Sequence, residues 1–174
     1  MSNFKKLFDE SQTAFRAQPE TAAVVFSTES RLISGFKSSV EARQFRFFAD
    51  EPEALGGKDT APNPVEYLLA ALSTCQEVTY RLYADALGIP VDGISITLDG
   101  DIDLRGFLDV ADDVRPGFLG IHGTVTIDSP ASEADIARLK ATVDRHCPVL
   151  DSLTNPTPVS LTINHVQETA VAAE

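Results

Sequence analysis

The chain has 174 residues, which is enough for one domain with a hydrophobic core and too few for two ordinary ones. Its 14 Lys and Arg stand against 26 Asp and Glu, and the formal net charge of -12 repels phosphates and anionic lipids. We therefore expect no nucleic-acid partner and no membrane partner. The start lacks the apolar core of a signal peptide, and no apolar run approaches the roughly 20 residues of a membrane span. We expect a single domain, 1–174, in the cytoplasm.

The first predicted element is a short amphipathic helix, and residues 1–18 are assigned to this N-terminal segment. Ser2 and Asn3 precede the helix as candidate caps, and Pro19 ends it. Its apolar side chains recur at roughly helical spacing and are Phe4, Leu7, Phe8 and Phe15.

The next region changes in character. Residues 22–49 are rich in β-branched and aromatic side chains, with a turn signal at Ser34 and Gly35, and predict two or three antiparallel strands. The stretch 51–64 collects Pro and Gly and is predicted to be a loop.

A long, mostly buried helix follows this loop. Asn63 is a natural N-cap, Pro64 suits the first turn, and Glu66 is favoured there by the helix dipole. Gly88 stands at the predicted C′ position, with Pro90 beyond it. The apolar positions between these signals are Leu68, Leu69, Ala71, Leu72, Cys75, Val78, Leu82 and Leu87.

Two strands and a second helix come next. Residues 91–106 and 118–128 alternate between apolar and polar side chains and predict two half-buried strands. A helix is predicted to begin after Ser132, and its apolar stripe runs to Cys147, where Pro148 stops it.

The C-terminal part predicts one more strand, at residues 157–166, and a flexible tail at residues 168–174. The order is helix, strands, long helix, two strands, helix and strand. This order is typical of an α+β fold with antiparallel sheets and two central helices.

Cys75 and Cys147 are the only cysteines in the chain, so they cannot build a disulfide framework. A permanent bridge between them would be unusual in a reducing compartment. They lie far apart in the chain and meet only if the two predicted helices bring them together. Either they are unrelated buried residues, as most free cysteines are, or they form a redox pair.

Other chemistries of these residues find less support. Cys75, His146 and Cys147 lack the Cys-x-x-Cys or His-x-x-x-His spacing of a metal site, and we expect neither a metal nor a cofactor. A cysteine-protease mechanism needs a histidine base for Cys75, and the candidates are His122, His146 and His165. A histidine beside a helix end is more often a surface cation near the dipole.

Three charged residues are candidates for a site around Cys75. Glu66 lies nine positions earlier on the same helix, about 13 Å away by helical rise, so the two can line one pocket without touching. Arg43 and Arg46 precede the loop on a predicted strand, where each also fits a solvated face or an ion pair. A one-residue slip of that strand would turn either side chain to the opposite face.

Several stretches of the chain form an ordered pattern. They are DEPEALGG, APNPVEYLLAALSTCQEVTYRLYADALGI, GDIDLRG, RPGF and HCPVLD. Asn-Pro-x-Glu opens a helix with a cysteine in its third turn, and a second cysteine followed by Pro ends a later helix. From about Arg43 to the last predicted strand, the chain resembles the osmotically inducible protein C and organic hydroperoxide resistance (OsmC/Ohr) superfamily.

The resemblance implies an OsmC-like subunit whose strands interleave with those of a second copy in an intertwined homodimer. It also implies a thiol peroxidase for organic hydroperoxides, in which Cys75 is peroxidatic and forms a sulfenic acid, and Cys147 resolves it as a disulfide. An external dithiol, often lipoyl-linked in this family, then reduces the pair. Leu68, Leu69 and Leu72 are expected to line the site and to favour alkyl or fatty-acyl peroxides.

The charged candidates also have counterparts in the family. Glu66 matches the second acidic position of the family's helix start, and Val65 occupies the first, which holds the catalytic acid in the best-studied branch. Arg43, with Arg46 as the alternative, matches the active-site arginine. A cation is needed because a thiol of pKa about 8.5 is mostly protonated near neutral pH, and only the thiolate attacks a peroxide.

A second hypothesis is a dimer of the same fold that binds a hydrophobic ligand or partner and has little or no peroxidase activity. Val65 and the ambiguous arginine motivate it. The sequence leaves both functions open.

Overall fold

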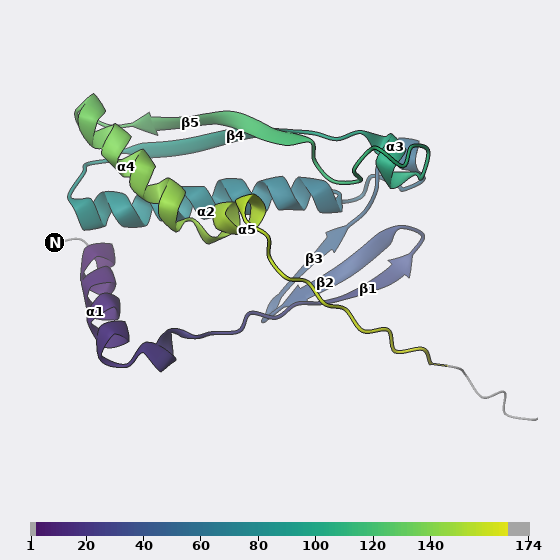
Figure 1. Cartoon of the computed structure of the whole chain (residues 1–174), viewed down its shortest axis with the longest axis horizontal. Coiled ribbons are helices and arrows are strands. Elements are labelled where there is room, and N and C mark those ends of the chain that lie inside the picture. The colour runs from purple at the N-terminus through teal and green to yellow at the C-terminus, as the bar shows by residue number, and fades with distance from the viewer. Residues whose placement is uncertain (1–2, 167–174) are drawn as a thin grey trace, which may run out of the picture.

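The computed structural model describes residues 3–166, and it confirms an α+β fold with antiparallel sheets and helices. This part of the chain contains one sheet of three strands and one of two. The long helix α2, Pro64–Leu87, runs along the two-stranded sheet, and the three-stranded sheet lies near its N-terminal end (Figure 1). The predicted cap Ser2 and the predicted tail 168–174 lie outside the described residues.

The predicted N-terminal helix is α1, Asn3–Ala17, which is followed by a short 3-10 helix, η1, at Pro19–Ala22. α1 packs against the last turns of α2, where the Phe8 ring meets the Tyr83 ring edge-on with 5.5 Å between centroids. Residues 23–28 then lead without regular structure into the first sheet.

Three antiparallel strands form the first sheet, which confirms the strands predicted before the loop. They are β1, Glu29–Ser34, β2, Lys37–Ala42, and β3, Phe45–Ala49, in the order β1-β2-β3. Tyr67 of α2 fastens the sheet, because its hydroxyl donates to the Phe48 carbonyl at 2.6 Å and its ring lies 5.4 Å from that of Phe47. The sheet is thereby attached to the first turn of α2.

The buried side chain of Asp50 holds the loop before α2, which includes a 3-10 turn, η2, at Glu53–Leu55. Its carboxylate accepts the Thr60 hydroxyl at 2.7 Å, the Thr60 N–H at 3.1 Å and the Glu51 N–H at 2.9 Å. The hydrogen bond from the Thr60 hydroxyl is the largest of the effects that hold the pKa of Asp50 below its ordinary value. The loop therefore delivers the chain to the start of α2 in a defined direction.

α2 begins with a capping box, so Glu66 does more than complement the helix dipole. The Asn63 side chain accepts the Glu66 N–H at 2.8 Å, and the Glu66 carboxylate accepts the Asn63 N–H at 2.8 Å. At the other end Gly88 has φ 70°, in the left-handed region that glycine adopts without a Cβ penalty. Both predicted ends of the helix are confirmed.

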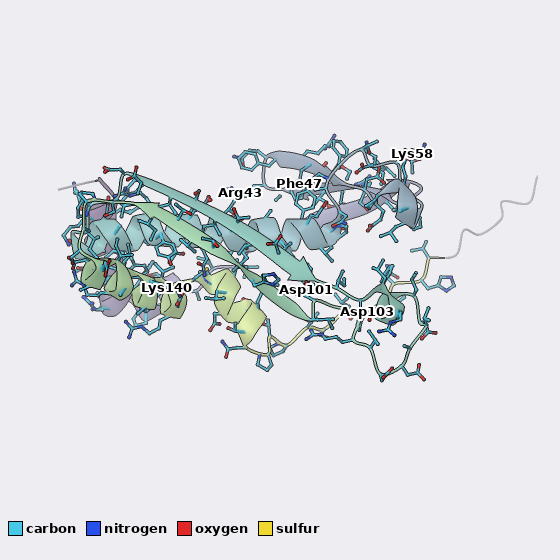
Figure 2. All side chains as sticks on the ribbon, turned by 90° about the horizontal axis from the view of Figure 1, so that it is seen from above. Arg43, Phe47, Lys58, Asp101, Asp103 and Lys140 are labelled. Atoms are coloured by element: carbon cyan, nitrogen blue, oxygen red, sulfur yellow. The ribbon has the colours of Figure 1, made fainter. Side chains whose placement is uncertain are left out.

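The second sheet consists of β4, Gly93–Asp101, and β5, Gly120–Asp128, which pair antiparallel. The prediction of one strand over 91–106 is wrong at its end, because Leu104–Phe107 forms a short helix, α3. The Asp103 side chain accepts the Arg105 N–H at 3.0 Å and so caps α3, an interaction that competes locally with the strand. Figure 2 shows Asp101 and Asp103 at this end of the sheet.

The second predicted helix is α4, Glu133–His146, and Ser132 is its N-cap. The prediction that Pro148 stops this helix holds for α4, but Pro148 also opens α5, Pro148–Thr154, because proline suits a first helical turn. The main hydrophobic core lies between α2, α4 and the second sheet. Its buried members are Tyr80, Ala84, Ile89, Val91, Leu139 and Val143.

The prediction of a last strand at residues 157–166 is wrong for the single chain, in which this segment has no regular structure. Val159, Leu161 and Ile163 are 80%, 90% and 91% exposed. A strand needs a neighbouring strand for its backbone hydrogen bonds, and neither described sheet includes this segment. The segment has the apolar alternation of a strand, but residues 3–166 provide no neighbouring strand for it.

Replacing Asn63 tests the capping box. Asn63→Ala removes the acceptor at the start of α2 and should lower the free energy of unfolding by about 1 kcal/mol. Urea denaturation followed by circular dichroism measures the change. Asn63→Ser keeps a capping oxygen and should lose much less. Equal losses in the two variants would contradict a stabilising role for the cap.

Candidate active site

The two cysteines lie next to each other. The thiol of Cys147 donates a weak hydrogen bond to the sulfur of Cys75, and the two Sγ atoms are 3.5 Å apart. Cys75 is half-buried in the middle of α2, whereas Cys147 connects α4 to α5 and is fully buried. A disulfide requires the sulfurs to approach by about 1.5 Å more. This contact is what a redox pair requires.

The packing of α4 against α2 places Cys147. Leu139 and Val143 are both 0% exposed and lie on the same helical stripe as Cys147, whose N–H donates to the Val143 carbonyl at 2.9 Å. Across the interface, burial raises the pKa of Tyr80 to about 12, with a smaller contribution from the charge of Asp144. The phenol of Tyr80 therefore stays neutral in this core.

Burial also raises the pKa of the Cys147 thiol, and it is the largest effect on this group. A backbone hydrogen bond from Leu150 opposes the shift, and the neighbouring Cys75 sulfur adds to it. Cys147 is therefore a neutral, shielded thiol near pH 7, with its sulfur 3.5 Å from that of Cys75.

A pocket of about 550 Å³ opens beside Cys75. It is mainly apolar, and it takes its walls from α2 and from the junction of α4 with α5. The pocket is lined by Ala71, Thr74, Cys75, Val78, Thr79, Leu82, Tyr83, His146 and Pro148. Cys147 lies behind Cys75, so a molecule that enters this pocket meets Cys75 first.

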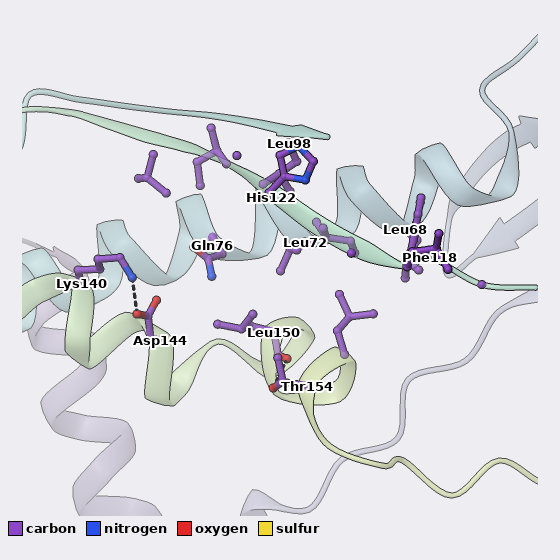
Figure 3. Close-up of a pocket in the computed structure, with 18 of the residues that line it drawn as sticks. Leu68, Leu72, Gln76, Leu98, Phe118, His122, Lys140, Asp144, Leu150 and Thr154 are labelled. Carbon is purple, nitrogen blue, oxygen red and sulfur yellow. Dashed lines mark hydrogen bonds and ion pairs between the residues drawn. The ribbon is translucent and has the colours of Figure 1, made fainter. Parts of the chain in front are cut away.

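The prediction that Leu68, Leu69 and Leu72 line the cysteine site is wrong for the single chain, because none of the three lines that pocket. Leu68 and Leu72 lie on a different face of α2 and line a second, larger groove of about 880 Å³. Figure 3 shows this groove, with Leu98 and His122 of the second sheet on one side and Leu150 and Thr154 of α5 on the other. A mostly apolar space of this size suits a ligand or a neighbouring protein segment.

Glu66 is exposed, and its carboxylate is occupied in the capping box. Cys75 comes two and a half turns later on α2, about 13 Å away by helical rise. In this chain Glu66 sets the start of the helix that carries Cys75 and does not contact the thiol.

The structure places both candidate arginines on the β2–β3 hairpin. Arg43 is a turn residue with φ 55°, not a strand residue, and its guanidinium lies 5.2 Å from the centre of the Phe45 ring. Arg46 is on β3, where its Nε donates to Glu41 at 3.0 Å. Within residues 3–166, no arginine hydrogen-bonds to either sulfur. Figure 1 shows this hairpin extending away from α2.

The sequence pattern did not single out Thr79 and Tyr83 of the cysteine pocket, which follow Cys75 by one and two helical turns. It named His146, from the end of α4, but in a different role. Helical periodicity could have found Thr79 and Tyr83. His146 was considered as a base or a surface cation, and its ring instead stacks on Tyr83 with 5.0 Å between centroids and 22° between planes.

The structure adds two observations on other partners. Among residues 3–166, no three His, Cys, Asp or Glu side chains are arranged to hold a metal ion. Each helix of that same stretch is too short or too polar to cross a membrane.

The model of the OsmC-like protein family matches residues 57–162, more than half of the chain, and the chain belongs to this family. The match spans α2 and both cysteines. A search of curated protein sequences finds no significant match.

Solved structures share the fold. The OsmC-like protein of Mycoplasma pneumoniae is 22% identical with a TM-score of 0.67, and the match covers 76% of this chain and 89% of that one. An organic hydroperoxide resistance protein OsmC of Legionella pneumophila is 21% identical with a TM-score of 0.58 over 75% and 91% of the two chains. An organic hydroperoxide resistance protein from Elizabethkingia anophelis is 17% identical with a TM-score of 0.57 over 77% and 91% of the two chains.

The different exposure of the two thiols predicts different reactivity. In the reduced protein at pH 7, iodoacetamide should modify Cys75 at least about tenfold faster than Cys147, because Cys147 is buried and has a raised pKa. Peptide mapping by mass spectrometry measures both rates. As the pH is raised, the modification rate of Cys147 should begin to rise only above the pKa of an ordinary thiol. Equal rates at pH 7 would contradict this difference.

Proposed function

We propose that the protein is a thiol-dependent peroxidase that reduces organic hydroperoxides to alcohols. The observation that carries the proposal is the 3.5 Å contact between a pocket-facing sulfur and a buried one. Family membership supports it, since two structural neighbours are described as organic hydroperoxide resistance proteins. The mechanism is argued below from this chain's own residues.

We assign the two thiols to different steps, and a pocket that is lined by Cys75 but not by Cys147 supports this assignment. The thiolate of Cys75 attacks one peroxide oxygen and the O–O bond breaks, which leaves Cys75 as a sulfenic acid and releases the alkoxide, protonated to the alcohol. The sulfur of Cys147 then attacks the Cys75 sulfur, and the hydroxyl leaves as water with the Cys147 proton. The apolar pocket favours an alkyl chain over hydrogen peroxide.

The cycle needs an external dithiol to reduce the disulfide, and a lipoyl-linked donor is the proposed class. A dithiol transfers two electrons and two protons and regenerates both cysteines. We place the cycle in the cytoplasm, where thiols are kept reduced and an external dithiol is available.

Cys75 also needs a cation to favour its thiolate, and we assign this role to Arg43 of a second copy, with Arg46 as the alternative. Arg43 is exposed in a turn and rests on an aromatic ring, whereas Arg46 already has a carboxylate partner. Arg43 lies in the turn between β2 and β3, and this hairpin extends away from α2 (Figure 1), which supports delivery to another subunit. Glu66 would then border the site as a helix-start carboxylate.

The exposed surface of the chain supports a homodimer. Its accessible surface is 13211 Å², against about 8,300 Å² expected for a compact monomer of this mass. Apolar side chains account for part of the excess, including Leu32 and Phe45 of the first sheet and Leu161 of the extended segment. Strand exchange with a second copy would cover them.

A second candidate function is the binding of a hydrophobic ligand, and the larger groove favours it. Its apolar walls come from α2, the second sheet and α5, and the ion pair between Lys140 and Asp144, at 2.5 Å, lies at one end (Figure 3). This groove does not contain Cys75. Binding there therefore requires no thiol chemistry.

Treatment of the reduced protein with a linear alkyl hydroperoxide tests the peroxidase. We expect both thiols to be consumed, the alcohol to form, and a Cys75–Cys147 disulfide to appear within one subunit by mass spectrometry. Cys75→Ser should lose turnover. Cys147→Ser should be oxidised at Cys75 and stop after one event, with a sulfenic acid that dimedone traps. If both thiols persist in excess peroxide, the proposal fails.

The ligand-binding alternative predicts an apolar molecule that stays with the purified protein. Native mass spectrometry should detect its mass, and Leu153→Glu, which puts a charge into the groove wall, should release it. Cys75→Ser is the matched control and should retain the ligand. A ligand-free protein with active thiols would contradict this alternative.

A further inference from the structure

α1 stands outside the family match, which begins at residue 57, yet it packs beside the cysteine pocket. Its Phe8 ring contacts Tyr83, and the Lys5 Nζ donates to the Ala86 carbonyl at 3.3 Å on the last turn of α2. The segment that follows α1 exposes Val25 and Phe26 almost fully. Both the Phe8 contact and the Lys5 contact thus lie at the C-terminal end of α2.

Three aromatic rings connect α1 to the thiols. Phe8 meets Tyr83 edge-on, and Tyr83 stacks on His146, which directly precedes Cys147. Both Tyr83 and His146 line the pocket beside Cys75. Tyr83 and His146 thus form one wall of that pocket, and Phe8 of α1 packs against this wall.

The contact adds to the constraint on Tyr83, which also packs against the edge of the main core. A tyrosine on a helix surface can change its χ1 rotamer, and Tyr83 is only half-buried. Edge-to-face and stacked ring contacts stabilise one orientation. With Phe8 on one side and His146 on the other, the Tyr83 ring is held against the pocket.

We propose that Phe8, Tyr83 and His146 determine the specificity of the Cys75 pocket by limiting the width of the molecules that reach its sulfur. Phe8 is a positioning residue that acts through Tyr83. The wall admits an unbranched alkyl group and slows a bulky tertiary or polycyclic one. The preference for linear hydroperoxides rests on the proposed peroxidase function, whereas the control of access to Cys75 does not.

Thiol labelling measures access without any peroxide chemistry. The reduced protein reacts with N-methylmaleimide or N-(1-pyrenyl)maleimide, and peptide mapping gives the rate at Cys75 for each reagent. Phe8→Ala should raise the rate with the pyrenyl reagent relative to the methyl reagent by about threefold to tenfold, which corresponds to the loss of one aromatic pair. Phe8→Tyr keeps the ring and should retain the wild-type ratio.

The matched control is Phe15→Ala, on the same helix at a 45% exposed position, which should leave the ratio unchanged. His146→Ala removes the other side of the stack at an exposed position and should also raise the ratio. If circular dichroism shows that Phe8→Ala does not fold, the His146→Ala variant still tests the proposal. An unchanged ratio in the folded variants overturns the proposal, as does an equal rise in Phe15→Ala.

The hydroperoxide arm separates this proposal from the proposed function. If the protein is a peroxidase, Phe8→Ala should raise kcat/KM for cumene hydroperoxide relative to a linear alkyl hydroperoxide by a similar factor. Altered labelling without any turnover would refute the peroxidase and keep the wall. Turnover with an unchanged preference and unchanged labelling would refute the wall and keep the peroxidase.

Discussion

The packing of α4 on α2 sets the position of both thiols. Leu139 and Val143 are fully buried against Tyr80 and Ala84, and the small Ala84 side chain lets the helices approach closely. Because Cys147 follows Val143 by one helical turn, it reaches the same interface, 3.5 Å from Cys75. A rotation of α4 by one residue, about 100°, would turn this thiol away from α2. The core that stabilises the domain also holds the thiols together.

Features that depend on local sequence could be predicted well. The stripe that ends at Cys147 and the cap signals at Asn63 and Gly88 gave the correct helices, because periodicity and capping act within a few residues. The stop signal at Pro148 also opens α5, since the same ring that ends one helix suits the first turn of the next. α3 was missed because a helix of 4 residues is too short to show a helical period. Its cap, Asp103, is the only local signal.

Features that depend on distant packing could be predicted only in part. Periodicity placed Cys75 on an apolar face but could not show that the neighbouring face, with Leu68 and Leu72, borders a different groove. The prediction of a strand at residues 157–166 was wrong for the single chain, because alternation gives only a tendency and a hydrogen-bonding partner decides whether a strand forms. The arginines belong to the same class, because their positions in the sequence do not report which elements their side chains contact. These positions depend on contacts between elements, which sequence spacing does not report.

The different environments of the two cysteines bear on the order of the proposed steps. A resolving cysteine that was already a thiolate would compete with Cys75 for the peroxide. Its own sulfur would then be oxidised to a sulfenic and further to a sulfinic acid. Burial excludes Cys147 from the pocket, and its raised pKa keeps the proton on its sulfur, while Cys75 lines the pocket. That proton is then useful, because the sulfenic hydroxyl of Cys75 must leave as water when the disulfide forms. The 3.5 Å contact between the two sulfurs keeps this proton close to the leaving group in the proposed step. The same desolvation that makes Cys147 a poor nucleophile toward bulk peroxide thus supplies an acid at the sulfur where the leaving group forms.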